Sequence, residues 1–219
     1  TKFGELIQQI HIDDVNLTWE LILINLSYNS FIVNWFLNNI KIGQEYDRKV
    51  LEGLINEQGF SSKGKTVVGN NCLIMAYCHV AHDSELGNNV IMSNAVQVAG
   101  EVTIDDYSVI GGGALIHQFT HIGQHVMVQG GSLVNKDIPP FVMAGRLPVS
   151  YAGINTVGLR RRGFTNEQIG EIQEIYRYLY MSGMNNSDAL AKIEEELPAC
   201  KERDEIVNFV RGSKRGVIR

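Results

Sequence analysis

The chain has 219 residues, and 19 lysines and arginines against 24 aspartates and glutamates give it a formal charge of −5. This acidic balance argues against general nucleic-acid binding, which normally uses a basic surface. No secretory leader is visible and the apolar runs are too short to cross a bilayer, so we expect no stable membrane insertion. Cys72, Cys78 and Cys200 lack the spacing of a disulfide framework and predict reduced thiols in a cytoplasmic protein.

Residues 1–62 share little with the organisation of the rest of the chain. The segment 10–25 is rich in β-forming residues, whereas the segment 28–60 combines an apolar run with a helical pattern. We predict an irregular or partial β-helix over residues 1–62, with an insertion or irregular cap at about 28–60.

A six-residue repeat organises the middle of the chain. Every sixth residue from Val68 to Val134 is a large apolar side chain: Val68, Ile74, Val80, Leu86, Met92, Val98, Ile104, Ile110, Ile116, Ile122, Val128 and Val134. This period is typical of β-helical solenoids, in which each unit is a short strand plus a corner and three units complete one coil. We therefore predict a parallel β-helix over residues 63–140. Residues eighteen apart should stack at a spacing of roughly 4.8 Å.

The coils should stop at Pro139 and Pro140, because proline cannot donate a hydrogen bond to a strand ladder. The glycine-containing segment 141–163 predicts an irregular connection. Residues 141–219 as a whole predict a linker followed by a small C-terminal α-helical domain, which would cover the exposed end of the solenoid.

Three helices are expected in that domain. Thr165 and Gln168 form a capping box at the start of the first helix. The second should begin at Ser187 or Asp188 and end near Pro198. The third should span about 202–211.

Histidines are concentrated in the predicted coils. Eighteen-residue stacking places Gly100 and Gln118 above His82, and His117 beside that column, so these four residues should line one groove. Asp83 directly follows His82. A histidine beside a carboxylate can act as a general base near neutral pH.

Other interpretations of these residues are possible. His82 and Asp83 could form a solvent-facing polar corner, and the spacing of His79 and His82 also suits a zinc site. The run from Arg160 to Arg162 is either a solvated charge cluster or a patch that binds phosphates or an acidic protein.

Several motifs resemble the UDP-N-acetylglucosamine acyltransferases that begin lipid A synthesis. They are His79-Val80-Ala81-His82-Asp83, Ala99-Gly100, His117-Gln118-Phe119, Asp137-Ile138-Pro139-Pro140, Gly153-Ile154-Asn155, Gly158-Leu159-Arg160-Arg161-Arg162-Gly163-Phe164 and Arg215-Gly216-Val217-Ile218-Arg219. The resemblance covers about residues 63–219. It implies a mainly β protein with a left-handed parallel β-helix, assembled as a homotrimer with active sites between subunits.

The resemblance also implies a reaction. His82 would remove the proton from the sugar 3-hydroxyl, which attacks the thioester of a 3-hydroxyacyl chain on acyl carrier protein. Asp83 would hold the imidazole tautomer, and the Gly100 N–H would donate to the oxyanion. Residues expected to contact substrate or carrier protein are His79, His117, Gln118, Asn155, Arg161 and Arg162. Neither a metal nor a cofactor is implied, because the thioester is already activated.

The sequence departs from that family at two places. Glu101 stands where members usually carry a second histidine, and the N-terminal third has no clear counterpart. Two alternatives therefore stay open: a zinc-dependent β-helix enzyme of the carbonic anhydrase type, and an inactive trimeric scaffold.

Overall fold

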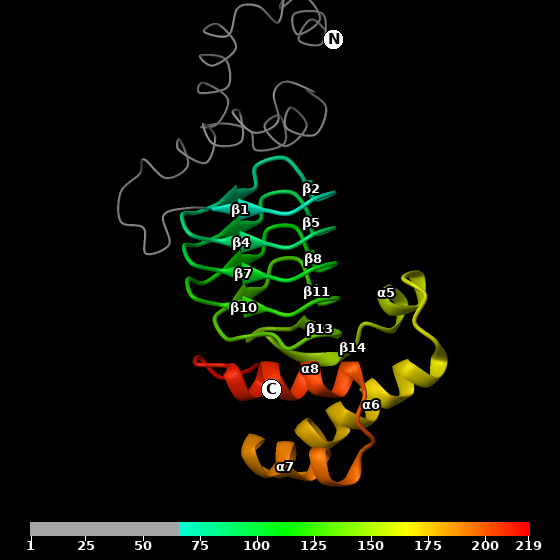
Figure 1. The fold of residues 1–219 in the computed structure, drawn as a ribbon. Helices are drawn as coiled ribbons and strands as arrows, with labels where there is room; N and C mark the ends of the chain where they lie inside the picture. Colours follow the sequence, from blue (N-terminus) through cyan, green and yellow to red (C-terminus); the bar gives the residue numbers. More distant parts are fainter. Residues whose placement is uncertain (1–65) are drawn as a thin grey trace, which may run out of the picture.

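The computed structural model describes residues 66–219 (Figure 1). The predictions for residues 1–62, including the insertion at about 28–60, lie outside the described residues.

Twelve two-residue strands follow one another between Val67 and Val134. They are β1 (Val67–Val68), β2 (Leu73–Ile74), β3 (His79–Val80), β4 (Glu85–Leu86), β5 (Ile91–Met92), β6 (Gln97–Val98), β7 (Thr103–Ile104), β8 (Val109–Ile110), β9 (Leu115–Ile116), β10 (His121–Ile122), β11 (Met127–Val128) and β12 (Leu133–Val134). Each strand pairs in parallel with the strand one coil away, as Val67 does with Glu85. The predicted parallel β-helix is confirmed.

The strands form three sheets, one on each side of the coil stack. Sheet A contains β1, β4, β7 and β10, sheet B contains β2, β5, β8 and β11, and sheet C contains β3, β6, β9 and β12. We call residues 81–84, 99–102 and 117–120 the C–A corner, because they connect sheet C to sheet A. Residues 87–90, 105–108 and 123–126 form the A–B corner.

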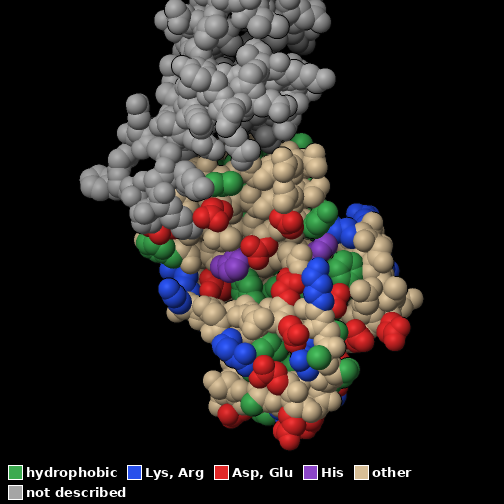
Figure 2. Space-filling view, in the orientation of Figure 1, with side chains coloured by type: hydrophobic (Ala, Val, Ile, Leu, Met, Phe, Trp, Pro, Cys, Tyr) green, Lys and Arg blue, Asp and Glu red, His purple; other side chains and the backbone are tan. Residues whose placement is uncertain are grey.

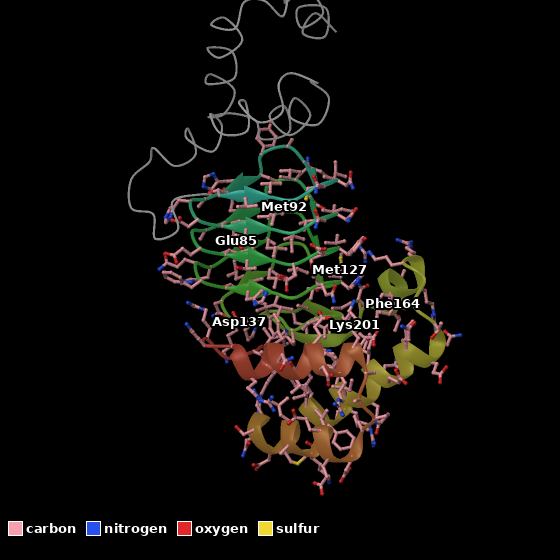
Figure 3. All side chains as sticks on the ribbon, in the orientation of Figure 1. Glu85, Met92, Met127, Asp137, Phe164 and Lys201 are labelled. Carbon is pink, nitrogen blue, oxygen red and sulfur yellow. The ribbon has the colours of Figure 1, made fainter. Side chains whose placement is uncertain are left out.

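The six-residue apolar series fills the interior of the coils. Its members are buried except Val68 and Val80, which are partly exposed. Met92 lies inside the coils, whereas Met127 lies on the outer side of sheet B (Figure 3). Each buried aliphatic side chain stabilises the fold by about 1.5–3 kcal/mol. The residues that repeat every six positions in the sequence therefore form the hydrophobic core of the coils.

The segment after the last coil differs from its prediction. An irregular connection over 141–163 is wrong for most of its length, because β13 (Val142–Gly145), β14 (Ser150–Ile154) and α5 (Thr156–Arg161) form there. Strand β13 pairs in parallel with β11 and extends sheet B, and β14 returns antiparallel to β13. The backbone groups at the edge of the last coil need partners, and this hairpin supplies them.

The three predicted helices are present. They are α6 (Asn166–Met181), α7 (Asn186–Glu196) and α8 (Lys201–Gly212). Thr165 and Gln168 make the predicted capping box. Helix α8 runs across the end of the coil stack, and α6 and α7 lie beyond it (Figure 1). The Tyr176 hydroxyl of α6 donates to the Pro140 carbonyl at 2.6 Å and joins the helices to the last coil.

The C-terminal residues return to the coils. Val217 forms a parallel bridge with Asp137, and the Ile218 N–H donates to the Asp137 carbonyl at 2.9 Å. Within residues 66–219, no helix combines the length and apolar character needed to span a bilayer.

Candidate active site

The C–A corner carries a histidine held by the aspartate that follows it. His82 Nδ1 lies 2.8 Å from Asp83 Oδ2. The His82 side chain is 45% exposed, whereas Asp83 is fully buried. Asp83 has a φ of +60°, the left-handed conformation that recurs at the corners of the coils. A buried carboxylate that accepts from Nδ1–H leaves the Nε2 lone pair of His82 available to take a proton.

Gly100 lies directly against the His82 ring one coil further on. A Cβ atom at position 100 would be 2.7 Å from both Cε1 and Nε2 of His82, so only glycine leaves room for the imidazole there. Within the described part of the chain, no oxygen accepts a hydrogen bond from the Gly100 N–H. This donor beside Nε2 is therefore free to bind an oxyanion.

The predicted column continues to Gln118. The Glu101 N–H donates to the His82 carbonyl at 3.0 Å, and the Phe119 N–H donates to the Gly100 carbonyl at 3.2 Å. These bonds confirm the eighteen-residue stacking of His82, Gly100 and Gln118 at one corner.

His117 lies beside this column and is exposed. Its Nδ1 is 3.1 Å from the Gln118 carbonyl and 3.3 Å from Nη2 of Arg215. The Arg215 guanidinium also donates to the Asn135 carbonyl. The C-terminal tail thus brings a cation to the C–A corner, which the position of Arg215 in the sequence did not predict.

The remaining predicted site residues are not gathered at this corner within one chain. His79 is exposed on the outer side of sheet C, in strand β3. Asn155 caps α5: its Oδ1 accepts from the Gly158 N–H at 3.1 Å, and its Nδ2 donates to the His125 carbonyl at 2.9 Å. Asn155 is buried against the A–B corner, and its contact with a substrate stays a prediction.

The arginine run follows Asn155 at the A–B corner. Arg161 is exposed, and Arg162 lies with Cζ 5.3 Å from the centroid of the Tyr107 ring. Burial lowers the pKa of Arg162. Acidic, basic and histidine side chains lie intermixed over the face drawn in Figure 2. Because no single charge sign dominates this face, a phosphate would bind there only where several cationic side chains lie close together.

His125 is a buried histidine that is not among the predicted site residues. His125 is 7% exposed at the A–B corner, and burial together with nearby Arg162 lowers its pKa to about 4. Its ring stacks on Tyr107, eighteen residues earlier, so the stacking rule that located the C–A corner also contained this signal.

No three histidine, cysteine, aspartate or glutamate side chains converge as metal ligands among residues 66–219. The His79 and His82 spacing that suggested a zinc site therefore has no third ligand of these kinds in the described residues.

A parallel β-helix with a carboxylate-held histidine at one corner and a helical C-terminal domain is the arrangement of a hexapeptide-repeat acyltransferase. Residues 65–100 match the bacterial transferase hexapeptide (six repeats) family, and residues 137–218 match domain 2 of UDP N-acetylglucosamine O-acyltransferase. The chain belongs to the UDP-N-acetylglucosamine acyltransferase family.

Curated relatives and solved structures agree with that assignment. The chain is 42% identical over 160 residues to an acyl-[acyl-carrier-protein]–UDP-N-acetylglucosamine O-acyltransferase of Burkholderia orbicola. The aligned region covers 71% of this chain and 61% of that protein. The acyltransferase structure from Bacteroides fragilis is 52% identical with a TM-score of 0.71, covering 74% of this chain and 63% of the other. That from Campylobacter jejuni is 30% identical with a TM-score of 0.67, covering 74% and 73%. The chain thus spans about 61% of the length of the curated relatives it matches.

Proposed function

We propose that this protein transfers a (R)-3-hydroxyacyl chain from acyl carrier protein to the 3-hydroxyl of UDP-N-acetylglucosamine, the first step of lipid A biosynthesis. The observation that carries the proposal is the His82 imidazole, held by Asp83 at Nδ1 and lying against Gly100. The names of the relatives, which are acyl-carrier-protein-dependent O-acyltransferases of UDP-N-acetylglucosamine, supply the substrates. They favour this reaction over the zinc-dependent alternative.

The chemistry follows from the geometry of the C–A corner. His82 Nε2 takes the proton of the 3-hydroxyl while that oxygen attacks the thioester carbonyl carbon. The oxyanion accepts a hydrogen bond from the Gly100 N–H. Collapse of the tetrahedral intermediate forms the ester and breaks the C–S bond, and the departing thiolate of the carrier takes the proton from His82. Asp83 keeps Nδ1 protonated and stabilises the transient imidazolium.

A homotrimer would complete the site. The outward side chains of sheet B are apolar: Leu73, Ile91, Val109, Met127 and Met143. Sheet C presents the apolar Leu115 and Leu133 beside the polar His79 and Gln97. Sheet A presents mainly polar side chains. Packing sheet C of one copy on sheet B of the next is a heterologous contact that can close into a ring. It would bring the C–A corner of one copy to the A–B corner of its neighbour.

In that assembly, the neighbouring copy supplies what the C–A corner lacks. Arg161 and Arg162 would bind the diphosphate or the acidic carrier protein, because guanidinium groups pair well with phosphates and carboxylates. Asn155 would contact the nucleotide sugar from the same segment. His117 and Gln118 would contact substrate from the C–A corner itself, and His79 would do so from the outer side of sheet C.

A cytoplasmic location is proposed as well. Cys72, Cys78 and Cys200 are thiols and not disulfides, which fits a reducing compartment, and Cys72 and Cys78 are buried at small corner positions of the coils.

Replacing His82 by Ala tests the reaction. We expect acyl transfer to UDP-N-acetylglucosamine to fall by at least about a thousandfold, because the general base is lost, while the assembly persists. Rates are measured with acyl carrier proteins that bear chains of several lengths. His121→Ala is the matched control, since His121 lies in strand β10 of sheet A and contacts Asp105 and the Phe209 ring of α8, away from the C–A corner. Substantial turnover by the His82→Ala protein would refute the assignment.

Two further measurements separate the alternatives. Stoichiometric zinc in the purified protein would favour the zinc-dependent enzyme. Failure of the wild-type chain to bind either UDP-N-acetylglucosamine or carrier protein by calorimetry would favour the inactive scaffold.

A further inference from the structure

A column of rings lies along the A–B corner. Tyr107 and His125 stack with their ring centroids 5.0 Å apart and an angle of 2° between the planes. Phe141 continues the column, 5.7 Å from His125 at an angle of 16°. All three residues have φ between +57° and +68°, the left-handed conformation of the corners, so the backbone of successive coils places the rings one over another.

The column contacts both ends of α5. At the start of this helix, the Asn155 N–H donates to the Phe141 carbonyl at 2.8 Å, and Asn155 Nδ2 donates to the His125 carbonyl at 2.9 Å. At its end, Arg162 lies over the Tyr107 ring. The segment that bears the arginines is therefore attached to the coils at both ends through these three corner residues.

Phe164 fills the space between α5 and the column. Its ring meets His125 edge-on at 5.1 Å and Phe141 at 6.0 Å. The label in Figure 3 shows Phe164 between the coils and α5. Gly163, with a φ of +87°, turns the chain so that Arg162 and Phe164 both return to the corner.

His125 takes part in this column by stacking. Its Nδ1 is buried and makes no hydrogen bond within the described residues. The low pKa of its ring keeps it uncharged at neutral pH, so it does not repel Arg162.

We propose that the column of Tyr107, His125 and Phe141 is a positioning element that orders α5 and holds Arg162 ready to bind the nucleotide diphosphate. This inference rests on the function proposed above and adds the residues that prepare its phosphate site. An arginine that is held in place before binding loses less side-chain freedom when it binds, which raises affinity without a new contact to the ligand.

Tyr107 gives the sharpest test, because Leu and Phe can replace it without β-branching at a left-handed position. Tyr107→Leu removes the ring beneath Arg162, and Tyr107→Phe keeps it. We expect Tyr107→Leu to raise the Kd for UDP and the KM for UDP-N-acetylglucosamine about tenfold, the size of one partly desolvated cation–π contact, with kcat within about twofold of wild type. Tyr107→Phe, which keeps the ring, should have the Kd and KM of the wild type.

A wild-type KM for Tyr107→Leu would overturn the proposal, as would an equal defect in Tyr107→Phe. A fall in kcat alone would also contradict it, because an ordered phosphate site acts on binding. As a control, thermal unfolding of each variant is measured, and we expect the coils to remain folded.

A second measurement needs no ligand. Trypsin cleaves after arginine, so the run from Arg160 to Arg162 reports the order of this segment. We expect cleavage there to be several-fold faster in Tyr107→Leu than in wild type and Tyr107→Phe. Equal rates would refute the ordering role. If wild-type protein binds no UDP-N-acetylglucosamine, the proposed function fails, and the trypsin comparison still decides the positioning role.

Discussion

Among single residues, Gly100 matters most to the candidate site, because it has no side chain. Its φ is not positive, so the backbone does not require glycine at this position. The requirement comes from the imidazole of His82, which occupies the space where a Cβ atom would lie. One residue thus both admits the base and presents an N–H beside it.

Gly100→Ala should separate these roles from folding. The added methyl group forces the His82 ring away from its position, and a displacement of about 1 Å in a reacting group can cost roughly a hundredfold in rate. We expect kcat to fall by about a hundredfold or more, with the coils still folded by circular dichroism.

The matched control for this change is Gly112→Ala. Gly112 occupies the same place in the six-residue unit, and its Cβ would lie 3.1 Å from the Asn94 carbonyl oxygen, against 2.7 Å from the His82 ring at Gly100. Wild-type kcat in Gly100→Ala would show that the His82 ring position is irrelevant to the reaction.

Some of these residues can be placed from the sequence, and others depend on contacts between distant parts of the chain. Adjacency in the chain made the pair of His82 and Asp83 visible, and the repeat placed Gly100 above it. Asn155 was expected to face a substrate, but its bonds to His125 and Gly158 join residues thirty and three positions away. No local pattern contains the first of these contacts.

Between elements, helix α8 meets the coils through a half-buried carboxylate, that of Glu205. Glu205 accepts a hydrogen bond from Gln124. Burial raises the pKa of Glu205 to about 7; the bond from Gln124 opposes this shift, and nearby Asp105 adds to it. His125, whose pKa falls to about 4, titrates in the opposite sense on a nearby coil segment.

The two groups predict opposing pH dependences of stability. Glu205 has a raised folded pKa, so its contribution is present below its usual pKa of 4.5 and is lost as the pH rises through about 7. His125 has a depressed folded pKa, so its contribution is present above 6.5 and is lost as the pH falls through about 4. Between pH 4.5 and 6.5 their effects on the free energy of unfolding partly cancel.

Glu205→Gln should therefore uncover the effect of His125. In this variant we expect the free energy of unfolding to fall by up to roughly 3 kcal/mol between pH 6.5 and 4, more steeply than in wild type. Denaturant unfolding across this range measures the slope. Glu195→Gln, at an exposed position of α7, is the control and should keep the wild-type profile. Parallel profiles for Glu205→Gln and wild type would contradict the prediction.

Across the whole molecule, the candidate residues are divided between two corners of one prism. His82 and Gly100 lie at the C–A corner, and Arg162 lies at the A–B corner with sheet A between them. No single chain brings these groups together. If neighbouring copies do so, each site uses one corner from each of two chains.

Mixing two inactive variants tests that arrangement. His82→Ala disables the C–A corner, and Arg162→Ala disables the A–B corner. If the chain forms the proposed trimer, assemblies re-formed from an equal mixture contain half of their C–A corners and half of their A–B corners intact, so about a quarter of the sites should combine two intact corners. We expect about a quarter of wild-type acyl transfer in the re-formed mixture and almost none in either variant alone. No recovery of activity in the mixed assemblies would refute a site that is shared between neighbouring copies.

The coils and the C–A corner can be predicted from the order of residues alone. A six-residue period is a local property that is repeated along the chain, because every coil buries the same positions, and one correct register then places His82, Gly100 and Gln118 together. The three helices were equally readable, since capping residues and helical periodicity are local signals.

Three features depend on contacts between distant residues: the hairpin of β13 and β14, the capping role of Asn155 and the ring column at the A–B corner. Strand β13 forms because the last coil offers unpaired backbone groups, not because residues 142–145 show a pattern of their own. Asn155 and Arg162 obtain their places from His125 and Tyr107, tens of residues away. Contacts of this kind depend on how the chain folds back onto the end of the solenoid. A short-range periodic pattern does not predict them, because they join residues that are far apart in the sequence.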